Sequence, residues 1–306
     1  MKKDLLSLYD LTKEDFKEII RRAKSLKNAL REGKPQAPLA GKILGLLFDK
    51  SSTRTRLSFE TGVFQLGGTS TFLNRRDIQL GRGETIADTA RVISRYLDGI
   101  VIRTFEQELV EEFARWAEIP VINGLTDLLH PCQILSDLLT IEEKKGGYEG
   151  LVIAYVGDGN NVANSWINAA ARIPIRLHLA CPEGYDPDGG ILEAGKGEAE
   201  EEIRLFRSAA EAVEDADVIY TDVWASMGQE EEQEKRAVIF KDYQVNSELV
   251  QKAKSDCIVM HCLPAHRGEE ITHEVMESGQ SVVFDQAENR LHAQKAILEI
   301  LMGGRK

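Results

Sequence analysis

Long apolar runs and an excess of positive charge are both missing from this sequence of 306 residues. No stretch approaches the roughly 20 consecutive apolar residues that a membrane-spanning helix requires. The formal net charge is -12, which argues against an extended surface for nucleic acid or for an acidic membrane. An anionic substrate would therefore need a local pocket of basic side chains.

Cysteine is scarce as well, and the four residues Cys132, Cys181, Cys257 and Cys262 show no pair spacing typical of a metal site. A chain of this length needs no disulfide framework, so we expect reduced thiols. The first residues lack the apolar stretch and the cleavage site of a secretion signal. Together these features predict a cytoplasmic protein.

The composition that is present, 42% hydrophobic and 29% charged residues, is ordinary for a folded globular chain. The length predicts two domains of roughly 150 residues each. Apolar, strand-like runs alternate with helix-like segments through both halves, a pattern typical of parallel sheets flanked by helices. We therefore predict an α/β fold with two doubly wound domains, each a mostly parallel sheet flanked by helices.

The first half opens with a predicted helix over 12–30, which a capping box of Thr12 and Asp15 begins. Further helices are predicted at 54–66, 85–97, 107–116 and 130–143, and strands at 42–48, 70–73, 100–102 and 120–122. The segment 143–150, rich in lysine and glycine, is the best single domain boundary.

The second half is predicted to hold strands at 151–156, 176–180, 218–221, 257–261 and 281–284, and helices at 162–172, 203–211 and 247–254. Acidic clusters at 198–202 and 230–234 are interpreted as solvated surface. A closing helix over 289–301 is expected to return to the first domain. The predicted domains are 1–145, joined by about 287–306, and 146–286.

The strongest local signal is the sequence FDKSSTRTR at 48–56, between a predicted strand and a predicted helix. Hydroxyl, guanidinium and backbone N–H groups would converge at a helix N-terminus, which already favours anions. The segment therefore indicates a phosphate site. In the plainer alternative, the Ser and Thr side chains only cap the helix while Arg54 and Arg56 face solvent.

Two further polar segments are expected at the same edge, because ligands of parallel sheets bind at the carboxyl ends of the strands. Arg103 follows the apolar run 100–102, and the sequence HPCQ at 130–133 begins a helix. Taken singly, Arg103 would also suit a surface ion pair and His130 a helix cap. Beside 48–56, both would suit the same anion.

The sequence GDGNNV at 157–162 resembles a dinucleotide fingerprint, since it follows a strand and opens a helix. Val162 replaces the third glycine, which close helix packing would need. We therefore expect Asn161 to contact a substrate other than a dinucleotide. An α/β oxidoreductase that uses this loop remains an alternative.

The sequence HCLP at 261–264 ends a strand, which places Cys262 at the ligand edge. A thiol hydrolase also uses a Cys–His pair, but neighbouring strand residues point to opposite faces, so His261 is poorly placed to deprotonate Cys262. The sequence DVWASMG at 222–228 combines a carboxylate, a hydroxyl and a flexible glycine at another strand end. It would suit a substrate loop or a plain loop equally.

Taken jointly, and in this order along nearly the whole chain, these segments resemble the aspartate/ornithine carbamoyltransferase family. The resemblance implies transfer of a carbamoyl group from carbamoyl phosphate to an amine by direct attack in a closed site, with no cofactor and no metal. The implied carbamoyl-phosphate site consists of Ser52, Thr53, Arg54, Thr55, Gln79, Arg103, His130, Gln133, Cys262, Leu263 and Arg290. The implied amine site consists of Asn161, Asp222, Ser226, Met227, Cys262 and Leu263.

The resemblance also implies roles, with Arg54, Arg103, His130, Cys262 and Arg290 as the catalytic set. The three arginines would bind the phosphate through charge-assisted hydrogen bonds. His130, helped by Arg103 and Thr55, would polarise the carbonyl oxygen. Cys262 and the Leu263 carbonyl would favour the neutral form of the attacking amine.

For the acceptor, the resemblance favours L-ornithine, which would give L-citrulline within arginine metabolism. Family members that act on aspartate carry proline and a further basic residue where this chain has Cys262. Asp222 would hold the α-ammonium group, while Asn161 and the backbone of Ser226 and Met227 would hold the carboxylate. Putrescine is disfavoured because it lacks that carboxylate. N-acetylornithine is disfavoured because its acetylated α-amine would no longer be a cationic partner for Asp222.

The family further implies a carbamoyl-phosphate-binding first domain, an ornithine-binding second domain, and closure that excludes water, with Gly228 as a hinge. Gln79 resembles a position that reaches carbamoyl phosphate from a neighbouring subunit, so a homotrimer or a multiple of trimers is implied. A sister carbamoyltransferase with another amine acceptor remains an alternative. A non-catalytic relative is disfavoured because Arg54, His130, Asp222 and Cys262 are all present.

Overall fold

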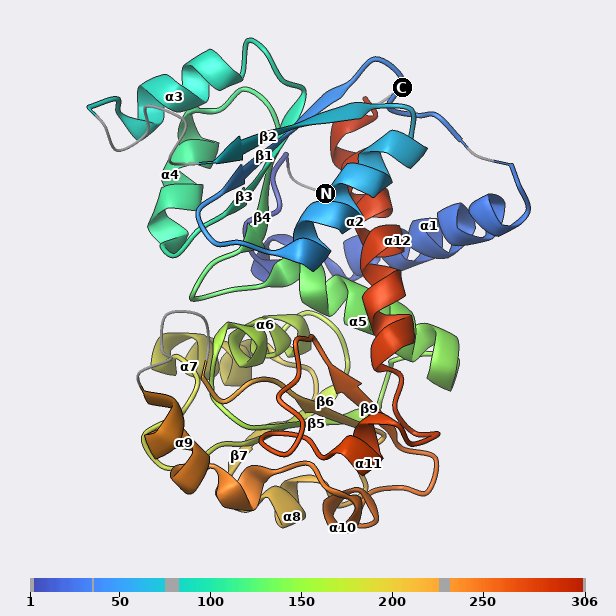
Figure 1. Cartoon of the computed structure of the whole chain (residues 1–306), viewed down its shortest axis with the longest axis vertical. Helices are drawn as coiled ribbons and strands as arrows, with labels where there is room; N and C mark the ends of the chain where they lie inside the picture. The colour runs from blue at the N-terminus through green and yellow to red at the C-terminus, as the bar shows by residue number, and fades with distance from the viewer. Residues whose placement is uncertain (1–2, 35, 75–82, 226–231, 305–306) are drawn as a thin grey trace. The chain divides into compact units, whose positions relative to one another are not determined.

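The computed structural model describes residues 3–34, 36–74, 83–225 and 232–304. The chain forms two compact units, the first from Met1–Leu139 and Glu288–Lys306 and the second from Thr140–Ala287. Each unit contains one parallel sheet accompanied by helices (Figure 1). The predicted α/β class with two doubly wound domains is confirmed.

The sheet of the first unit has four parallel strands in the order β2-β1-β3-β4. They are β1 Ile43–Phe48, β2 Thr69–Asn74, β3 Gly99–Arg103 and β4 Val121–Leu125. Phe48 lies opposite Arg103, and the N–H of Asp49 donates to the Arg103 carbonyl at 2.8 Å. The carboxyl ends of β1 and β3 therefore lie side by side.

The helices that accompany this sheet begin where the sequence supplies caps. At the start of the first helix, the N–H of Asp15 donates to Thr12 Oγ1 and the N–H of Thr12 donates to Asp15 Oδ2, which is the predicted capping box. The helices and the short 3-10 turn are η1 Leu8–Asp10, α1 Lys13–Arg31, α2 Thr53–Gln65, α3 Ile86–Ile93, α4 Gln107–Trp116, α5 Pro131–Lys145 and α12 Val283–Met302. The chain passes between the two units within α5 and α12.

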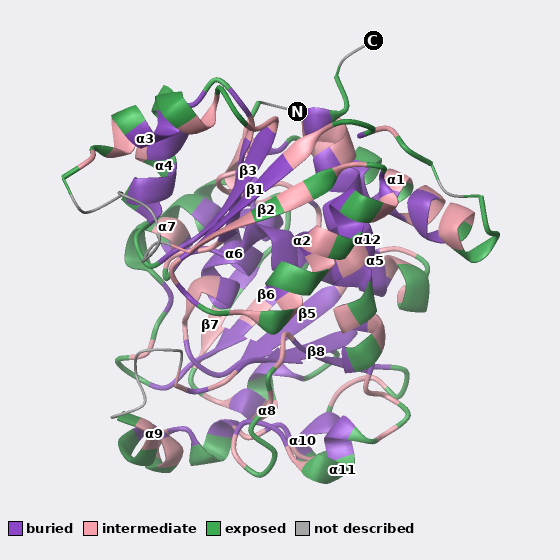
Figure 2. Ribbon diagram, turned by 45° about the horizontal axis from the view of Figure 1, so that its top comes forward, coloured by how far each residue is buried: buried purple, intermediate pink, exposed green. Residues whose placement is uncertain are grey.

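The central strands of the first unit are buried along almost their whole length, as Figure 2 shows in purple for β1 and β3. Apolar residues of β3 and β4 pack against Phe113 and its neighbours in α4. The edge strand β2 keeps partly exposed side chains. This burial explains why the central strands are continuous apolar runs in the sequence.

The second unit has five parallel strands in the order β7-β6-β5-β8-β9. They are β5 Val152–Val156, β6 Arg176–Ala180, β7 Ile203–Phe206, β8 Val218–Thr221 and β9 Ile258–His261. The helical segments are α6 Asn161–Ala170, α7 Gly189–Glu198, α8 Ala209–Ala212, α9 Gln233–Ile239, η4 Lys241–Tyr243, α10 Ser247–Val250 and α11 His273–Met276.

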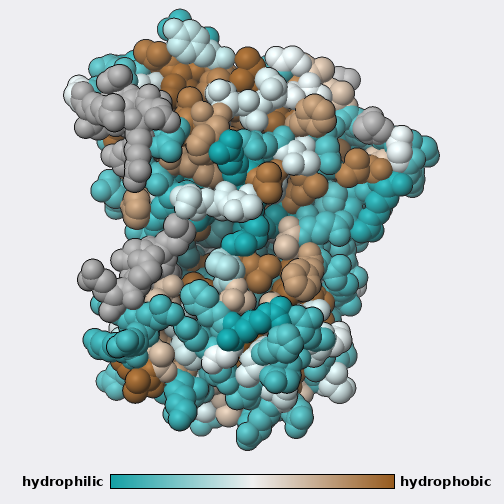
Figure 3. All heavy atoms as spheres, viewed as in Figure 1, coloured by the Kyte–Doolittle hydropathy of each residue, from teal (hydrophilic) through white to brown (hydrophobic). Residues whose placement is uncertain are grey.

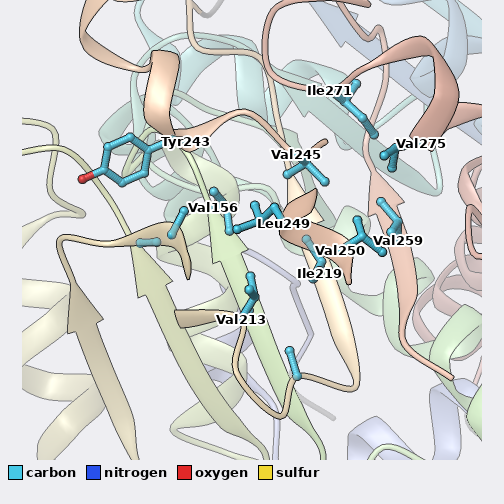
Figure 4. Close-up of a cluster of buried hydrophobic side chains, with 14 of the residues drawn as sticks. Val156, Val213, Ile219, Tyr243, Val245, Leu249, Val250, Val259, Ile271 and Val275 are labelled. Carbon is cyan, nitrogen blue, oxygen red and sulfur yellow. The ribbon is translucent and has the colours of Figure 1, made fainter. Parts of the chain in front are cut away.

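An apolar cluster anchors the sheet of the second unit (Figure 4). It joins Val156 of β5, Ile219 of β8 and Val259 of β9 to Leu249 of α10. Elsewhere in this unit, the rings of Tyr155 and Tyr220 stack with centroids 5.9 Å apart. The rigid sheet fixes the positions at which the polar loops after β5, β8 and β9 begin.

Two predicted elements of the second unit are wrong. Residues 203–206 form the edge strand β7, and only the short α8 remains of the helix predicted over 203–211. Pairing of Ile203 with Leu177 of β6 overrides the helix-like pattern. The strand predicted at 281–284 is reduced to one bridge between Ser281 and Val259, because α12 begins at Val283.

Three helices of this unit, α7, α9 and α11, have no counterpart in the prediction. Glycine-rich sequence concealed α7, although the structure requires a small residue at Gly195. A Cβ atom at that position would lie 2.3 Å from Ile167 Cγ2 of α6. The beginning of α9 falls in the acidic cluster that the sequence analysis interprets as solvated surface.

The C-terminal part of α12 belongs to the first unit. Lys27 Nζ donates to Asn289 Oδ1 at 2.7 Å, and Arg22 pairs with Glu299 at 2.6 Å. No helix in the described part of the chain is long and apolar enough to span a membrane. On the face drawn in Figure 3, apolar side chains lie in patches between polar ones.

His292 of α12 makes the first unit sensitive to acid. Its side chain is only 3% exposed, and burial together with Lys295 and Lys27 lowers its pKa from 6.5 to about 4. An unfolded histidine keeps a pKa near 6.5, so the unfolded state binds more protons between these two values. We therefore expect His292 to reduce the free energy of unfolding as the pH falls from about 6.5 to about 4, by up to roughly 3 kcal/mol.

Urea unfolding of the unmodified chain and of His292→Gln at pH 7.0, 5.5 and 4.5 would measure this contribution. The variant should lose less stability on acidification than the unmodified chain. His273→Gln, at an exposed position, controls for the replacement of a histidine as such. If the free energy of unfolding changed equally with pH in His292→Gln and in the unmodified chain, His292 would not be the acid-sensitive group.

Candidate active site

The candidate anion site lies where the strand order of the first unit reverses. The chain builds outward from β1 to β2 on one side and from β3 to β4 on the other. The loops that leave β1 and β3 therefore diverge, and ligands of open α/β sheets bind at such a point. The segment 49–54 leaves β1 here, and Arg103 ends β3.

Three cations lie on the segment after β1, and the structure separates their roles. Lys50 pairs with Asp127 and lies 4.3 Å from the centroid of Phe105. Arg56 pairs with Glu60 of its own helix at 2.9 Å. Within the described chain, the guanidinium of Arg54 has neither a hydrogen bond nor an ion pair. Arg54 is therefore the cation of this segment that can accept an external anion.

The start of α2 combines a cap with open donors. Ser52 is the N-cap residue, and its Oγ accepts the N–H of Thr55 at 3.2 Å. The capping alternative was therefore correct for Ser52. The N–H groups of Thr53 and Arg54 have no carbonyl partner within the helix, as in the first turn of any helix. They leave a partial positive charge beside Arg54.

Arg290 of α12 is held by a buried polar network. It donates to Thr55 Oγ1 at 2.7 Å and to Gln133 Oε1 at 2.9 Å. The amide nitrogen of Gln133 in turn donates to Asp137 Oδ1 at 2.8 Å. Arg290, Thr55, Gln133 and Asp137 are each at most 4% exposed. A single network thus brings together α2, α5 and the C-terminal helix, as the sequence analysis expects for Thr55, Gln133 and Arg290.

His130 is the uncharged member of this group. Burial, with the nearby charges of Arg290 and Arg103, holds its pKa well below the ordinary value. The ring is therefore neutral at physiological pH, and it can polarise a carbonyl oxygen by donating a hydrogen bond. Arg103 is itself 7% exposed, so the surface ion pair considered from sequence is not its setting.

A second candidate site lies at the corresponding reversal in the second unit, between β5 and β8. Asp222 directly follows β8 and is 6% exposed. Its Oδ2 accepts from Asn160 Nδ2 at 2.8 Å, and its Oδ1 accepts from the Cys262 thiol at 2.8 Å. Three loops, after β5, β8 and β9, thus meet at one carboxylate.

Asn160 is a site residue that the sequence analysis missed. It is the N-cap of α6, where its Oδ1 accepts the N–H groups of Val162 and Ala163, and its amide holds Asp222. The predicted neighbour Asn161 is the first residue of the helix and is partly exposed. The signal was present in the sequence, because asparagine before a helix is a preferred cap.

Arg236 is a second residue that was missed, since it lies in a helix that was not predicted. It pairs with Asp158 at 3.0 Å and donates to the Trp224 carbonyl at 2.7 Å. Burial raises the pKa of Asp158 to about 6, although Arg236 acts in the opposite direction. Arg236 thereby joins the loop after β5 to the segment that follows Asp222.

Gly159 of the 157–162 segment serves packing within the second unit. A Cβ atom at Gly159 would lie 2.1 Å from the backbone nitrogen of Pro187. The close approach of that loop, and not a bound pyrophosphate, thus accounts for Gly159. Gln79, Ser226, Met227 and the expected hinge Gly228 lie outside the described residues.

The four cysteines differ in accessibility, which gives a direct chemical test. Cys132, Cys181 and Cys257 are buried, and burial raises the pKa of all three thiols, to about 12 for Cys132 and Cys257. Cys262 is partly exposed. Because thiolates are the reactive species, iodoacetamide should label the native chain at about one site per chain. Mass spectrometry should place the label on Cys262.

Cys262→Ala supplies the control for this labelling. The variant should take up no label while it is native, and all remaining thiols should react once it is unfolded. Uptake of two or more labels by the native chain would contradict the assigned accessibilities. Native labelling that survives in Cys262→Ala would do the same.

Comparison with known proteins gives the family. The model of the aspartate/ornithine carbamoyltransferase carbamoyl-P binding domain matches residues 3–143, and that of the Asp/Orn binding domain matches 149–301. The chain belongs to the aspartate/ornithine carbamoyltransferase family. The oxidoreductase alternative is therefore set aside.

Three of the similar proteins are ornithine carbamoyltransferases by name. The ornithine carbamoyltransferase of Syntrophus aciditrophicus is 67% identical over 99% of this chain and 100% of its own length. That of Thermococcus kodakarensis is 55% identical over 99% of this chain and 98% of its own length. The solved ornithine carbamoyltransferase from Pyrococcus furiosus has a TM-score of 0.96 and 53% identity, covering 99% of this chain and 98% of that one.

Proposed function

We propose that this chain carries out ornithine carbamoyl transfer through the residues of its two candidate sites. The enzyme converts carbamoyl phosphate and L-ornithine to L-citrulline and phosphate. The observation that carries this assignment is the grouping of Arg103 and Arg290 around a neutral His130, together with Arg54, whose guanidinium makes no hydrogen bond or ion pair with the described residues. Full-length identity of 67% to a named ornithine carbamoyltransferase supports it.

Carbamoyl phosphate binds through its phosphate group at the start of α2. Arg54, Arg103 and Arg290 supply three guanidinium groups for a dianion, and the hydroxyls of Ser52 and Thr53 lie at the same helix start. Charge builds on the phosphate oxygen as the bond to the carbamoyl carbon breaks. Guanidinium groups that are already in place therefore stabilise the transition state more than the bound substrate.

The carbamoyl carbonyl is polarised by His130, with Arg103 and Thr55. Since Gln133 uses one amide hydrogen for Asp137 and its oxygen for Arg290, its second amide hydrogen remains for the substrate. Asp137 is fully buried and accepts the hydrogen bond from the Gln133 amide. We propose that it fixes the orientation of Gln133 and, through it, that of Arg290.

Ornithine binds at the second site. Asp222 receives the α-ammonium group, and Asn161 with the backbone of Ser226 and Met227 receives the carboxylate. The δ-amine resembles a lysine side chain with a pKa of about 10.4, so it must lose its proton before it attacks. Cys262 and the Leu263 carbonyl favour the neutral amine. Cys262 and Leu263 also complete the proposed carbamoyl-phosphate site.

The neutral amine attacks the carbamoyl carbon directly. A C–N bond forms, the C–O bond to phosphate breaks, the nitrogen gives up one proton to the departing phosphate, and the arginines hold that phosphate. The proposed step uses no cofactor, no metal and no covalent enzyme intermediate. We propose Arg54, Arg103, His130, Cys262 and Arg290 as its catalytic residues.

Three features of the assembly and setting remain proposals. The predicted domain 1–145, joined by about 287–306, is proposed to bind carbamoyl phosphate, and the predicted domain 146–286 to bind ornithine. A homotrimer or a multiple of trimers, with Gln79 reaching a neighbouring subunit, would cover the apolar side chains that the first unit exposes. Phe64 and Tyr96 are 76% and 73% exposed there. A cytoplasmic location agrees with four free thiols.

An acceptor comparison tests the proposed specificity. At a fixed saturating concentration of carbamoyl phosphate, kcat/KM for ornithine should exceed that for putrescine, aspartate and N-acetylornithine by at least about a hundredfold. That ratio corresponds to roughly 3 kcal/mol, the scale of unpaired polar groups in a site built for them. A higher kcat/KM for putrescine would reassign the chain to a sister carbamoyltransferase.

A further inference from the structure

A hydrogen-bonded chain runs from a buried carboxylate to the backbone beside Cys262. Glu270 Oε1 lies 2.9 Å from His261 Nε2, and the N–H of Leu263 donates to His261 Nδ1 at 2.8 Å. A backbone N–H can only donate, so Nδ1 must carry a lone pair. The ring proton therefore resides on Nε2 and is donated to Glu270.

Neither side chain of this pair can exchange its partner for water. The side chains of His261 and Glu270 are both 0% exposed. Glu270 Oε1 also accepts the backbone N–H of His266 at 2.6 Å, which ties the ring to the loop after β9. His261 is fixed at its own backbone, where its N–H donates to Gln286 Oε1 at 2.9 Å.

Leu263, whose N–H donates to the His261 ring, has an unusual backbone conformation. Leu263 has a φ of 57°, in the left-handed region that leucine rarely adopts. A conformation of this kind persists only where the surroundings over-determine it, and such residues cluster at active sites. The His261 ring supplies the acceptor for the N–H of this residue.

Cys262, which lies between His261 and Leu263 in the sequence, is oriented by a different residue, Asp222. Its thiol donates to Asp222 Oδ1 at 2.8 Å, so the Cys262–Leu263 segment is held by a carboxylate and by an imidazole at once. Because both nitrogens of His261 are engaged, the ring has no free lone pair to deprotonate the thiol. A thiol hydrolase that uses His261 as the base for Cys262 is therefore excluded.

We propose that His261 is a positioning residue for the amine acceptor, with Glu270 selecting the ring tautomer that accepts the Leu263 N–H. The proposal rests on the proposed function, in which the Leu263 carbonyl and the Cys262 thiol receive the δ-amine. His261 touches no substrate. It sets the orientation of the Leu263 backbone, and thereby the direction of the Leu263 carbonyl that accepts a hydrogen bond from the δ-amine.

Two amide variants test this role as a matched pair. In His261→Asn the side-chain oxygen takes the place of Nδ1 and still accepts the Leu263 N–H, whereas in His261→Gln the amide reaches toward Glu270 instead. We expect His261→Asn to keep kcat/KM for ornithine within about fivefold, and His261→Gln to lose about fiftyfold or more. Because Leu263 also belongs to the proposed carbamoyl-phosphate site, the affinity for carbamoyl phosphate, measured by calorimetry, should change in His261→Gln by a much smaller factor than kcat/KM for ornithine. His178→Asn in β6 controls for loss of a partly buried histidine in the same sheet.

Equal losses in the two amide variants, or no loss in either, would overturn the proposal. So would a loss in carbamoyl-phosphate affinity of the same size as the loss in kcat/KM, because it would indicate a general structural defect. If the unmodified chain forms no citrulline in the same assay, the proposed function fails instead.

A second measurement needs no variant that might fail to fold. The chain has six histidines, so histidine-selective ¹⁵N labelling gives a simple spectrum. Long-range ¹H–¹⁵N correlation should show one buried ring with its proton on Nε2, in contact with the Leu263 amide proton. A His261 ring protonated on Nδ1 would contradict the proposal whatever the kinetics.

Discussion

Arg54→Ala should lower kcat for citrulline formation by a factor of at least about 10² to 10³ while the chain remains folded. Removal of one preorganised donor to developing charge typically has an effect of that size, roughly 3–4 kcal/mol. The fold should survive because, within the described residues, the Arg54 guanidinium makes no hydrogen bond or ion pair that folding would lose. Steady-state kinetics and circular dichroism on the purified variant measure both halves of this expectation.

Arg56→Ala is the matched control for this experiment. It removes the same side chain two positions further along α2, but there the guanidinium pairs with Glu60 and lies over the Phe72 ring. Exposed pairs of this kind contribute at most about 1 kcal/mol, so kcat should change by less than about threefold. Similar losses in Arg54→Ala and Arg56→Ala would mean that Arg54 has no special role in turnover.

Asp222→Asn should raise KM for ornithine by about a hundredfold, with a smaller change in the affinity for carbamoyl phosphate. The substitution keeps the shape of the side chain but removes the charge that would face the α-ammonium group. Loss of one partner of a buried charged pair costs about 2–5 kcal/mol. Initial rates at varied ornithine, with calorimetric binding of carbamoyl phosphate, separate the two effects.

Asp217→Asn controls for damage to the sheet in the Asp222 experiment. Asp217 is also buried, precedes the same strand β8, accepts the N–H of Val152 and pairs with Lys254. Since it lies at the opposite end of the strand, its replacement should lower stability and leave KM for ornithine near normal. An unchanged KM in Asp222→Asn would remove Asp222 from the ornithine site.

The sequence predicts the fold well where a single strong pattern decides it. Central strands such as 43–48 and 152–156 are buried on both faces, so they appear as continuous apolar runs. The pattern fails at β7, an edge strand of four residues whose pairing with β6 decides its conformation. It fails again at α7, where contact with Ile167 requires glycine at a helical position.

The candidate site was predictable to the extent that its residues lie at strand ends. Arg103, Asp222 and Cys262 all come at or directly after a strand, and the parallel order of each sheet brings its strand ends to one edge. The links between distant segments were not predictable. The pairing of Arg290 with Thr55, and that of Glu270 with His261, depend on how separate elements pack.

The central claim, transfer of a carbamoyl group to ornithine, is tested most directly by product stoichiometry. The purified chain, supplied with carbamoyl phosphate and L-ornithine, should release citrulline and phosphate in equal amounts, and Arg54→Ala should reduce both together. Phosphate release that is independent of ornithine, or the absence of citrulline at saturating substrates, would contradict the account.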